Sequence, residues 1–487
     1  MIHRRLHPLM IMMLLAGCAV GPDYQPPAPP AVTHWNDKGD SGVKSQTTSA
    51  ATNPRWWKTF GSPQLDSLVE RAIAGNLTLQ QTVLRIAGAR EQINQAGGAF
   101  YPSVNGNLQA TRQQLGLEGE LKSHGVYDQL DSIDPNLKGA LGPLTQPINL
   151  YQGSFDAQWE LDLWGKLARV REQSEWEAIA SEQDYRATIL STIDTTAQLY
   201  WNIALLNQQM AYQAASLDIA RQTLAQIESW QRAGKVGLLD VLQSRQTVIS
   251  RQNQLLSLKQ QRAISRNALA LLLNRPPAQH SDEAPALDVH QRVAIASATP
   301  LAALASRPDL QAAESRLRAA LAGSDAARLS FYPTLSLQGT LSAGSQIFHQ
   351  WFNDPLRTVG SSVGAPFIQW NTVQLTVEQA SVKVQQEAVN FRRTAYTALS
   401  EVDDAMEKRL NADEQRERLL QSLQLGQRRL TLTESRYRAG AVDYQTLLNA
   451  QDALLDVQNS LAQNQYDYLY ATLQLWLAQG GNNPQQR

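Results

Sequence analysis

Apolar residues recur at intervals of seven along two long stretches of the chain, and this spacing predicts helices that pack as coiled coils. The rows in the first stretch are Ile203, Met210, Leu217 and Leu224, and then Val241, Val248, Leu255 and Leu269. The row in the second stretch is Leu447, Leu454, Leu461, Tyr468 and Leu475. Proline, the main helix breaker, is absent from residues 148–275 and 367–483. We therefore expect four long helices, over about 163–232, 238–274, 371–438 and 444–480.

Two segments that follow Tyr-Pro pairs alternate apolar and polar residues and are predicted to be strands. After Tyr332-Pro333, leucines at 335, 337 and 341 alternate with Ser336, Gln338 and Thr340. Such alternation is typical of transmembrane strands with an apolar outer face. With returning strands, the expected set is about 101–113, 153–162, 332–343 and 356–367. Four strands cannot close a barrel, so a pore needs several chains, and three chains would supply twelve strands. The alternative is a hairpin that lies on the helices.

The chain contains an internal repeat, which predicts its domain organisation. AGGAFYPSVNGNLQAT around Phe100 matches DAARLSFYPTLSLQGT around Phe331, and ESWQRAGKVGLLDVL matches ESRYRAGAVDYQTLL. We expect a first repeat at 56–280, an equatorial linker at 281–306, a second repeat at 307–481 and a short tail at 482–487. The pair Trp56-Trp57 opens the first repeat and is expected to pack against the helices rather than bind a ligand.

The N-terminus has the composition of a secretory signal. Arg4 and Arg5 precede a short apolar run that ends in Leu-Ala-Gly-Cys, and Cys18 is the only cysteine of the 487 residues. This ending resembles the lipobox of bacterial lipoproteins, which implies cleavage of residues 1–17 and acylation of Cys18. Residues 18–55, rich in Pro, Gly, Ser and Thr, are expected to form a lipidated, extended tether. Ala19 after the cysteine favours sorting to the outer membrane.

The remaining chemistry argues against an enzyme and against nucleic-acid binding. The formal net charge is −1, without a basic stripe. The seven histidines are scattered, and neither a zinc-binding His pair nor a nucleotide-binding or nucleophile-elbow motif is present. Asp403, Asp404 and Glu407 are expected to be solvated or pore-facing charges of a long helix rather than acid/base catalysts. We predict no catalytic residues, no metal and no cofactor beyond the lipid on Cys18.

The order of motifs resembles that of the TolC-like outer-membrane factors, in particular their NodT-like lipoprotein subclass. The motifs are CAVGPDYQPP, WWKTFGSPQLDSLVERAIAGN, WELDLWGKL and SRPDLQAAESRLRAALAGSDAARLSFYPTLSL, and the resemblance extends from Cys18 to about Gly481. It implies a mainly α fold with a membrane β-barrel part. In such a homotrimer, long helical hairpins form a periplasmic α-barrel, and four strands per chain contribute to a twelve-stranded β-barrel in the lipid of the outer membrane.

The resemblance also implies roles for the two Arg-Ala-Gly turns, which would be the periplasmic tips. The family pattern of the gate is matched by Tyr437 and Arg438, but Gln445 and Asn449 stand where the family has a leucine and an aspartate. Asp443, one turn away, is the remaining source of negative charge at the gate. The predicted adaptor-docking residues are Arg232, Gly234, Val236, Gly237, Leu238, Leu239, Asp240, Gly440 and Val442. Simple helix capping is the other explanation for the two glycines.

The function implied by the resemblance is passive export. The chain would be the outer-membrane channel of a tripartite efflux system, with a periplasmic membrane-fusion adaptor and an inner-membrane pump of the RND type as partners. Its cargo would be drugs or other small toxic molecules. The alternatives are the exit duct of a type I protein-secretion system and a non-conducting, lipid-anchored coiled-coil scaffold. The sequence does not identify the cargo.

Overall fold

The computed structural model describes residues 55–113, 117–133, 147–277, 283–294 and 300–481. The predicted signal peptide, Cys18, nearly all of the tether and the C-terminal tail therefore lie outside the described residues. The described chain forms two compact units. One contains residues 89–177 and 318–386, and the other contains residues up to 88, 178–317 and from 387 onward. Each unit draws on both halves of the chain, so the units cut across the two repeats that the sequence predicts as domains.

Long helices dominate the chain, as the heptad spacing predicts. The helices of the first half are η1 (Trp56–Phe60), α3 (Pro63–Gly75), α4 (Leu77–Gly98), α5 (Leu117–Ser123), α6 (Val126–Ile133), α8 (Lys166–Arg232) and α9 (Leu238–Leu272). Those of the second half are α10 (Pro300–Ser306), α11 (Pro308–Leu329), η3 (Phe348–Gln350), η4 (Pro366–Gln369), α12 (Trp370–Arg438) and α13 (Tyr444–Ala478). The 67 residues of α8 span roughly 100 Å at 1.5 Å per residue.

The four strands form a single antiparallel sheet, which belongs to the first unit. They are β1 (Ser103–Gln113), β2 (Ile148–Leu161), β3 (Thr334–Ser345) and β4 (Leu356–Gly364), in the order β1-β2-β3-β4. Strand β2 begins at Ile148, earlier than the predicted start at 153, because the whole length of β1 pairs with it, from Ser103 opposite Gln158 to Gln113 opposite Ile148.

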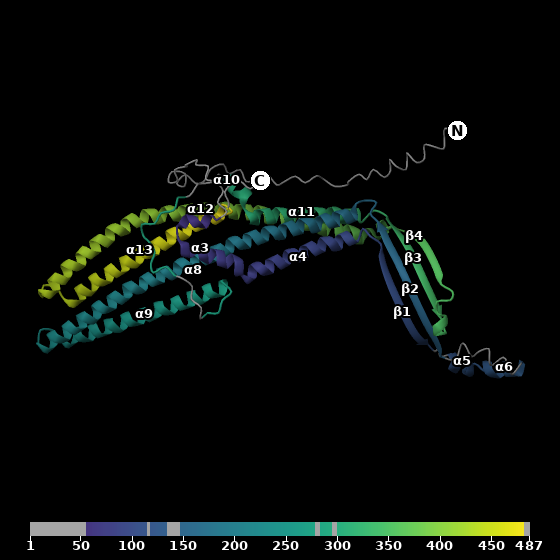
Figure 1. The fold of residues 1–487 in the computed structure, drawn as a ribbon, viewed down its shortest axis with the longest axis horizontal. Coiled ribbons are helices and arrows are strands. Elements are labelled where there is room, and N and C mark those ends of the chain that lie inside the picture. The colour runs from purple at the N-terminus through teal and green to yellow at the C-terminus, as the bar shows by residue number, and fades with distance from the viewer. Residues whose placement is uncertain (1–54, 114–116, 134–146, 278–282, 295–299, 482–487) are drawn as a thin grey trace, which may run out of the picture. The chain divides into compact units, whose positions relative to one another are not determined.

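The helices pair as two hairpins, α8 with α9 and α12 with α13 (Figure 1). Hydrogen bonds join the first pair, including one from Asn202 Nδ2 to Ser265 Oγ at 2.9 Å. In the second pair, Asn464 Nδ2 donates to the carbonyl oxygen of Ala412 at 3.1 Å. Among the residues that the structure describes, none of the helices contains an uninterrupted apolar stretch of the length that a bilayer crossing requires.

The main apolar core of the second unit, which we call the helical unit, lies where η1 and α3 cover α8 and α13. The Trp56 indole stacks on Trp476 with ring centroids 5.6 Å apart, and Phe60 lies 4.9 Å from Trp201. Trp56 and Trp57 are 3% and 7% exposed. The tryptophan pair is thus a packing element, as the sequence indicates.

Candidate functional site

The two hairpin turns have the same backbone geometry. Gly234 and Gly440 have φ angles of +70° and +72°, a left-handed conformation that favours glycine. After each glycine, a backbone N–H reaches back across the last helical turn: Lys235 N donates to Trp230 O and Ala441 N to Arg436 O, both at 2.9 Å. This is the hydrogen-bond pattern of a Schellman cap. Capping is therefore a sufficient reason for the glycine in each Arg-Ala-Gly turn.

The helix that follows each turn is capped by an acidic residue, but in two different ways. At the first turn, Asp240 reaches back and its Oδ2 accepts the N–H of Gly237 at 3.2 Å. At the second turn, Asp443 is itself the N-cap and accepts the N–H of Thr446 at 2.8 Å. Hydrogen bonds from the Thr446 side chain and from its backbone N–H hold the pKa of the exposed Asp443 carboxyl below its usual value. Asp240 and Asp443 thus both have a local structural role.

An apolar cluster packs the two hairpins against each other just inside the turns. Ile227, Val241 and Tyr444 are buried in it, with the half-buried Tyr437 against them. The ring of Tyr437 lies 5.4 Å from that of Trp230 and 6.3 Å from that of Tyr444. Burial, with Tyr444 and Asp240 nearby, raises the pKa of Tyr437 to about 12, so the phenol is neutral at physiological pH. We call these four residues, together with Trp230, the tip cluster.

The predicted gate residues differ in burial: Tyr437 is half-buried, whereas the other four are exposed. Tyr437 belongs to the tip cluster, whereas Arg438 is exposed, and no hydrogen bond joins the two within the described chain. Gln445 instead accepts from Gln243 of the other hairpin, and its Nε2 donates to Asn449 Oδ1 at 2.9 Å. Gln445 therefore links α9 to α13 within one chain, and Asn449 supports it from the next turn of α13.

Part of the predicted docking surface is exposed and apolar. Leu238 and Leu239 are 63% and 76% exposed at the first turn. Val236 is half-buried against the tip cluster. Arg232, Gly234, Gly237 and Gly440 are exposed, and Asp240 and Val442 are half-buried. Exposed leucines at the end of a hairpin are typical of an interaction surface.

The sheet has one apolar and one polar face, as the alternation predicts. Cross-strand neighbours on the apolar face include Val104 with Ala157, Phe155 with Leu341, and Gly339 with Val359. Those on the polar face include Asn105 with Asp156, Asp156 with Thr340, and Thr340 with Thr358. On the single chain, the apolar side chains of Val104, Phe155 and Val359 are exposed. Such a sheet suits an environment that is lipid on one side and water on the other.

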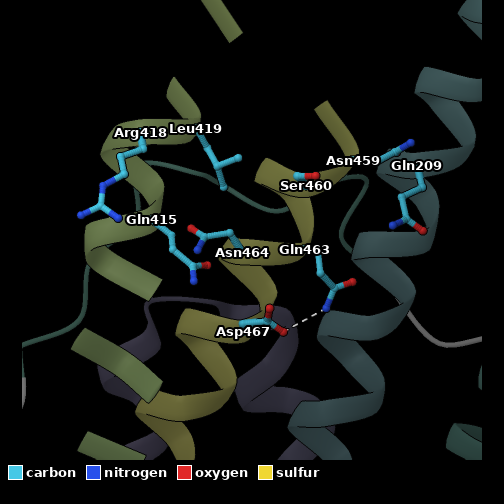
Figure 2. Close-up of a pocket in the computed structure, with 9 residues that line it drawn as sticks. All are labelled: Gln209, Gln415, Arg418, Leu419, Asn459, Ser460, Gln463, Asn464 and Asp467. Atoms are coloured by element: carbon cyan, nitrogen blue, oxygen red, sulfur yellow. Dashed lines mark hydrogen bonds between the residues drawn. The ribbon is translucent and has the colours of Figure 1, made fainter. Parts of the chain in front are cut away.

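Polar side chains also line a cavity of about 580 Å³ between α8, α12 and α13 (Figure 2). Its walls are Gln209, Gln415, Arg418, Leu419, Asn459, Ser460, Gln463, Asn464 and Asp467. Figure 2 shows Gln463 donating to Asp467, at 2.9 Å. The described chain has no group of acidic, His or Cys side chains that could hold a metal ion. Amide side chains of Gln and Asn predominate among these lining residues.

A smaller cavity of about 220 Å³, in the same unit, contains an aspartate with a shifted pKa. Burial raises the pKa of Asp194 to about 6, although Gln474 donates to its Oδ1 at 2.7 Å and opposes the shift. Arg307 lines the same cavity and donates to Asp309 at 2.7 Å, to Glu401 at 2.6 Å and to the carbonyl oxygen of Ala478 at 3.0 Å. Arg307 thus connects the start of α11 to α12 and to the end of α13.

The family is decided by the match of most of the chain to one family model, described as outer membrane efflux protein, over residues 68–275 and 300–481. The chain belongs to the outer membrane efflux protein family. This efflux protein is 29% identical over 478 residues to the pyoverdine export outer membrane protein OpmQ of Pseudomonas putida, covering 98% of this chain and 97% of that one. It is 28% identical over 495 residues to the cation efflux system protein CusC of Escherichia coli, covering 98% and 99%.

The fold of the efflux protein is similar to that of the CmeC outer membrane channel of Campylobacter jejuni. The TM-score is 0.80 at 20% identity, and the match covers 96% of each chain. The predictions of an outer-membrane efflux protein, and of a mainly α fold with a four-stranded sheet, are confirmed. As a member of this family, the chain is an efflux protein and not an enzyme.

Sequence reasoning missed several residues of these sites. Trp230 and Gln243 contact the predicted gate residues from the other hairpin, and Asp194 and Arg307 share a cavity although they are distant in sequence. Nothing in the sequence around Trp230 or Gln243 indicated that these residues would contact the gate residues. The sheet did offer a signal, because Asp156 is a lone aspartate at a polar position of an alternating strand.

Proposed function

We propose that three copies of this efflux protein form a passive export duct. The observation that carries the proposal is the two-faced sheet, whose outer strands β1 and β4 have no further strand partner within the described chain. Unpaired strand edges are unfavourable in lipid, and a membrane-spanning sheet satisfies them by closing. Three sheets joined edge to edge give a twelve-stranded barrel, with the apolar face toward lipid and the polar face toward the channel.

The helical hairpins would continue the duct into the periplasm, with the two turns of each chain at the far end. The exposed Leu238 and Leu239 support docking of a periplasmic adaptor there. The adaptor would connect the duct to an inner-membrane pump of the RND type, which supplies the energy for export. Closure of the duct would depend on the tip cluster and on the exposed Arg438.

The cargo class that we propose is small molecules or ions that are harmful inside the cell. Relatives are named for pyoverdine export, cation efflux, and toluene efflux, and their names differ in cargo although the chains align over nearly their whole length. A common duct with different cargoes is expected where the pump and the adaptor select the substrate. Drugs are therefore among the expected cargoes of this chain.

We also propose that Cys18 is acylated and becomes the first residue of the mature protein. A barrel already holds the chain in the membrane, so the lipid would serve sorting and assembly more than anchoring. Replacing Cys18 behind an ordinary cleavable signal should abolish incorporation of labelled palmitate and leave some functional trimers. If no trimer reaches the outer membrane, this division of roles is wrong.

Planar-bilayer recordings of the purified full-length protein test the duct directly. We expect single-channel conductance steps and a trimer that resists SDS without heating. A lipid-anchored scaffold would give no conductance at any voltage, and that result would overturn the proposal. Export assays with candidate pumps then separate small-molecule efflux from protein secretion, because a secretion duct would release a polypeptide only with its ATP-driven partner.

A further inference from the structure

A single uncompensated charge lies in the middle of the polar face of the sheet. Asp156 of β2 is flanked by Asn105 on β1 and Thr340 on β3, and Thr340 pairs with Thr358 on β4. The carboxylate accepts hydrogen bonds from Ser154 Oγ and Thr340 Oγ1, both at 2.9 Å. Its neighbours across and along the strands are thus neutral, and they hold the carboxylate in a fixed position.

The other charges of the strands are either compensated or on the opposite face. Glu160 also lies on the polar face, but its carboxylate forms an ion pair with Lys166 at 2.7 Å. Arg112 and Arg357 lie on the apolar face, because their cross-strand partners, Asn149 and Leu341, belong to that face. Within the four strands, Asp156 therefore contributes the only unpaired charge of the polar face.

Strand geometry does not require this charge. Both hydrogen bonds that Asp156 accepts come from hydroxyl groups, one to each carboxylate oxygen. An asparagine could accept one of them at its Oδ1 and donate from its Nδ2 to the other hydroxyl oxygen. Aspartate is also unfavourable in strands, and a half-buried carboxylate without a cation costs desolvation free energy. The fold of the sheet therefore does not need the negative charge of Asp156. We look for its role in the solutes that move along the polar face.

We propose that Asp156 sets the ion preference of the duct, as a ring of three negative charges in the membrane part of the channel. The proposal rests on the trimeric barrel proposed above, in which the polar face lines the water-filled passage. Rings of acidic side chains favour cations in channels. At the helical tips Gln445 and Asn449 are neutral, and the negative charge of Asp443 lies on an exposed helix cap. Asp156 would add a separate ring of negative charge in the sheet, and its part in the preference for cationic over anionic solutes is measured by substituting it alone.

The test is the reversal potential of single channels in a salt gradient at low ionic strength, measured on the full-length trimer. Asp156→Asn should keep a conducting channel and lower the cation-to-anion permeability ratio about threefold, since three nearby charges are removed at a salt concentration where screening is weak. The difference should shrink toward zero in 1 M salt, where the Debye length is about 3 Å. Asp156→Glu should keep the preference of the unmodified protein.

Two further variants protect the test from effects on folding. Gln158→Asn shortens a neutral side chain on the same face of the same strand and should leave the reversal potential unchanged. Asp156→Cys permits modification of the assembled channel: a sulfonate thiol reagent should restore the cation preference, and a quaternary-ammonium reagent should reverse it. A conducting channel whose reversal potential does not respond to Asp156→Asn or to either reagent would overturn the proposal for Asp156. Loss of all conductance in the unmodified protein would instead overturn the duct itself.

Discussion

The indole ring of Trp230 lies 5.4 Å from the phenol ring of Tyr437, and this contact joins the last turn of α8 to the last turn of α12. The two helices come from different repeats, so the contact fixes one hairpin against the other close to both Arg-Ala-Gly turns. Because Tyr437 also faces the buried Tyr444, loss of either ring of the pair would loosen the whole tip cluster.

Trp230→Ala should therefore make the tips more mobile. We expect the local free energy of opening to fall by about 1–2 kcal/mol, from lost ring burial and the aromatic contact. Faster amide hydrogen exchange in the two turns, with unchanged exchange in the sheet, would demonstrate this. Trp230→Phe keeps a ring in place and should lose much less. Equal exchange in the Ala variant and the unmodified protein would show that the contact does not hold the tips.

Arg438→Ser should raise the leak of a bulky antibiotic into cells without reducing stability. The side chain is exposed and has no ion-pair partner within the described chain, so its loss should change the free energy of unfolding by less than about 0.5 kcal/mol. Antibiotic susceptibility and single-channel conductance measure the leak. Arg436→Ser is the matched control, since it removes the same charge two residues earlier on the same helix end. Equal leak from both variants would contradict a specific gating role for Arg438.

Arg307→Met should destabilise the helical unit. The guanidinium donates to Asp309, Glu401 and the Ala478 carbonyl, and only 10% of its side chain is exposed. Removing it leaves acceptors without a donor, with an expected loss of about 2–3 kcal/mol in the free energy of unfolding.

Chemical denaturation of detergent-solubilised protein measures the loss at Arg307. Arg418→Met is the control, because Arg418 forms an exposed ion pair with Glu414, and it should cost less than about 1 kcal/mol. Arg307→Lys should fall between the two, since lysine cannot reproduce the forked donor geometry. A cost at Arg307 no larger than that at Arg418 would exclude the connecting role.

Asp194 should make stability depend on pH. Its folded-state pKa is raised to about 6 by burial, against about 4 in an unfolded chain. The folded state therefore binds the proton more strongly, and its stabilisation is fully present below pH 4 and is lost as the pH rises through 6. The charged groups that line the same cavity are Arg307, Asp309 and Glu401.

Asp194→Asn should remove this dependence, because the amide can still accept the hydrogen bond from Gln474. Between pH 4 and pH 7 we expect the unmodified protein to lose about 1–2 kcal/mol relative to the variant, after allowance for solvent screening. Thermal unfolding of the two proteins across this range provides the comparison. Parallel stability curves would show that Asp194 does not titrate in this window.

The local sequence determined the elements themselves. Heptad spacing predicted the long helices, and α8 and α12 end at the predicted Arg232 and Arg438. The Tyr-Pro breaks and the alternation after them predicted β1 and β3 and the polarity of each face. These features follow from the chain alone because helix and strand periodicities, proline and glycine act over a few residues.

The tertiary structure alone decided which residues meet. Asp156 lies opposite Thr340, 184 residues away, and Trp230 contacts Tyr437 of the other hairpin. The two compact units likewise combine segments from both repeats. A periodic pattern indicates whether one face of a helix or strand is apolar or polar. It does not indicate which other element packs against that face, because many elements have faces of similar composition. Strand register and helix packing select one partner, so these pairs exist only once the whole chain has folded.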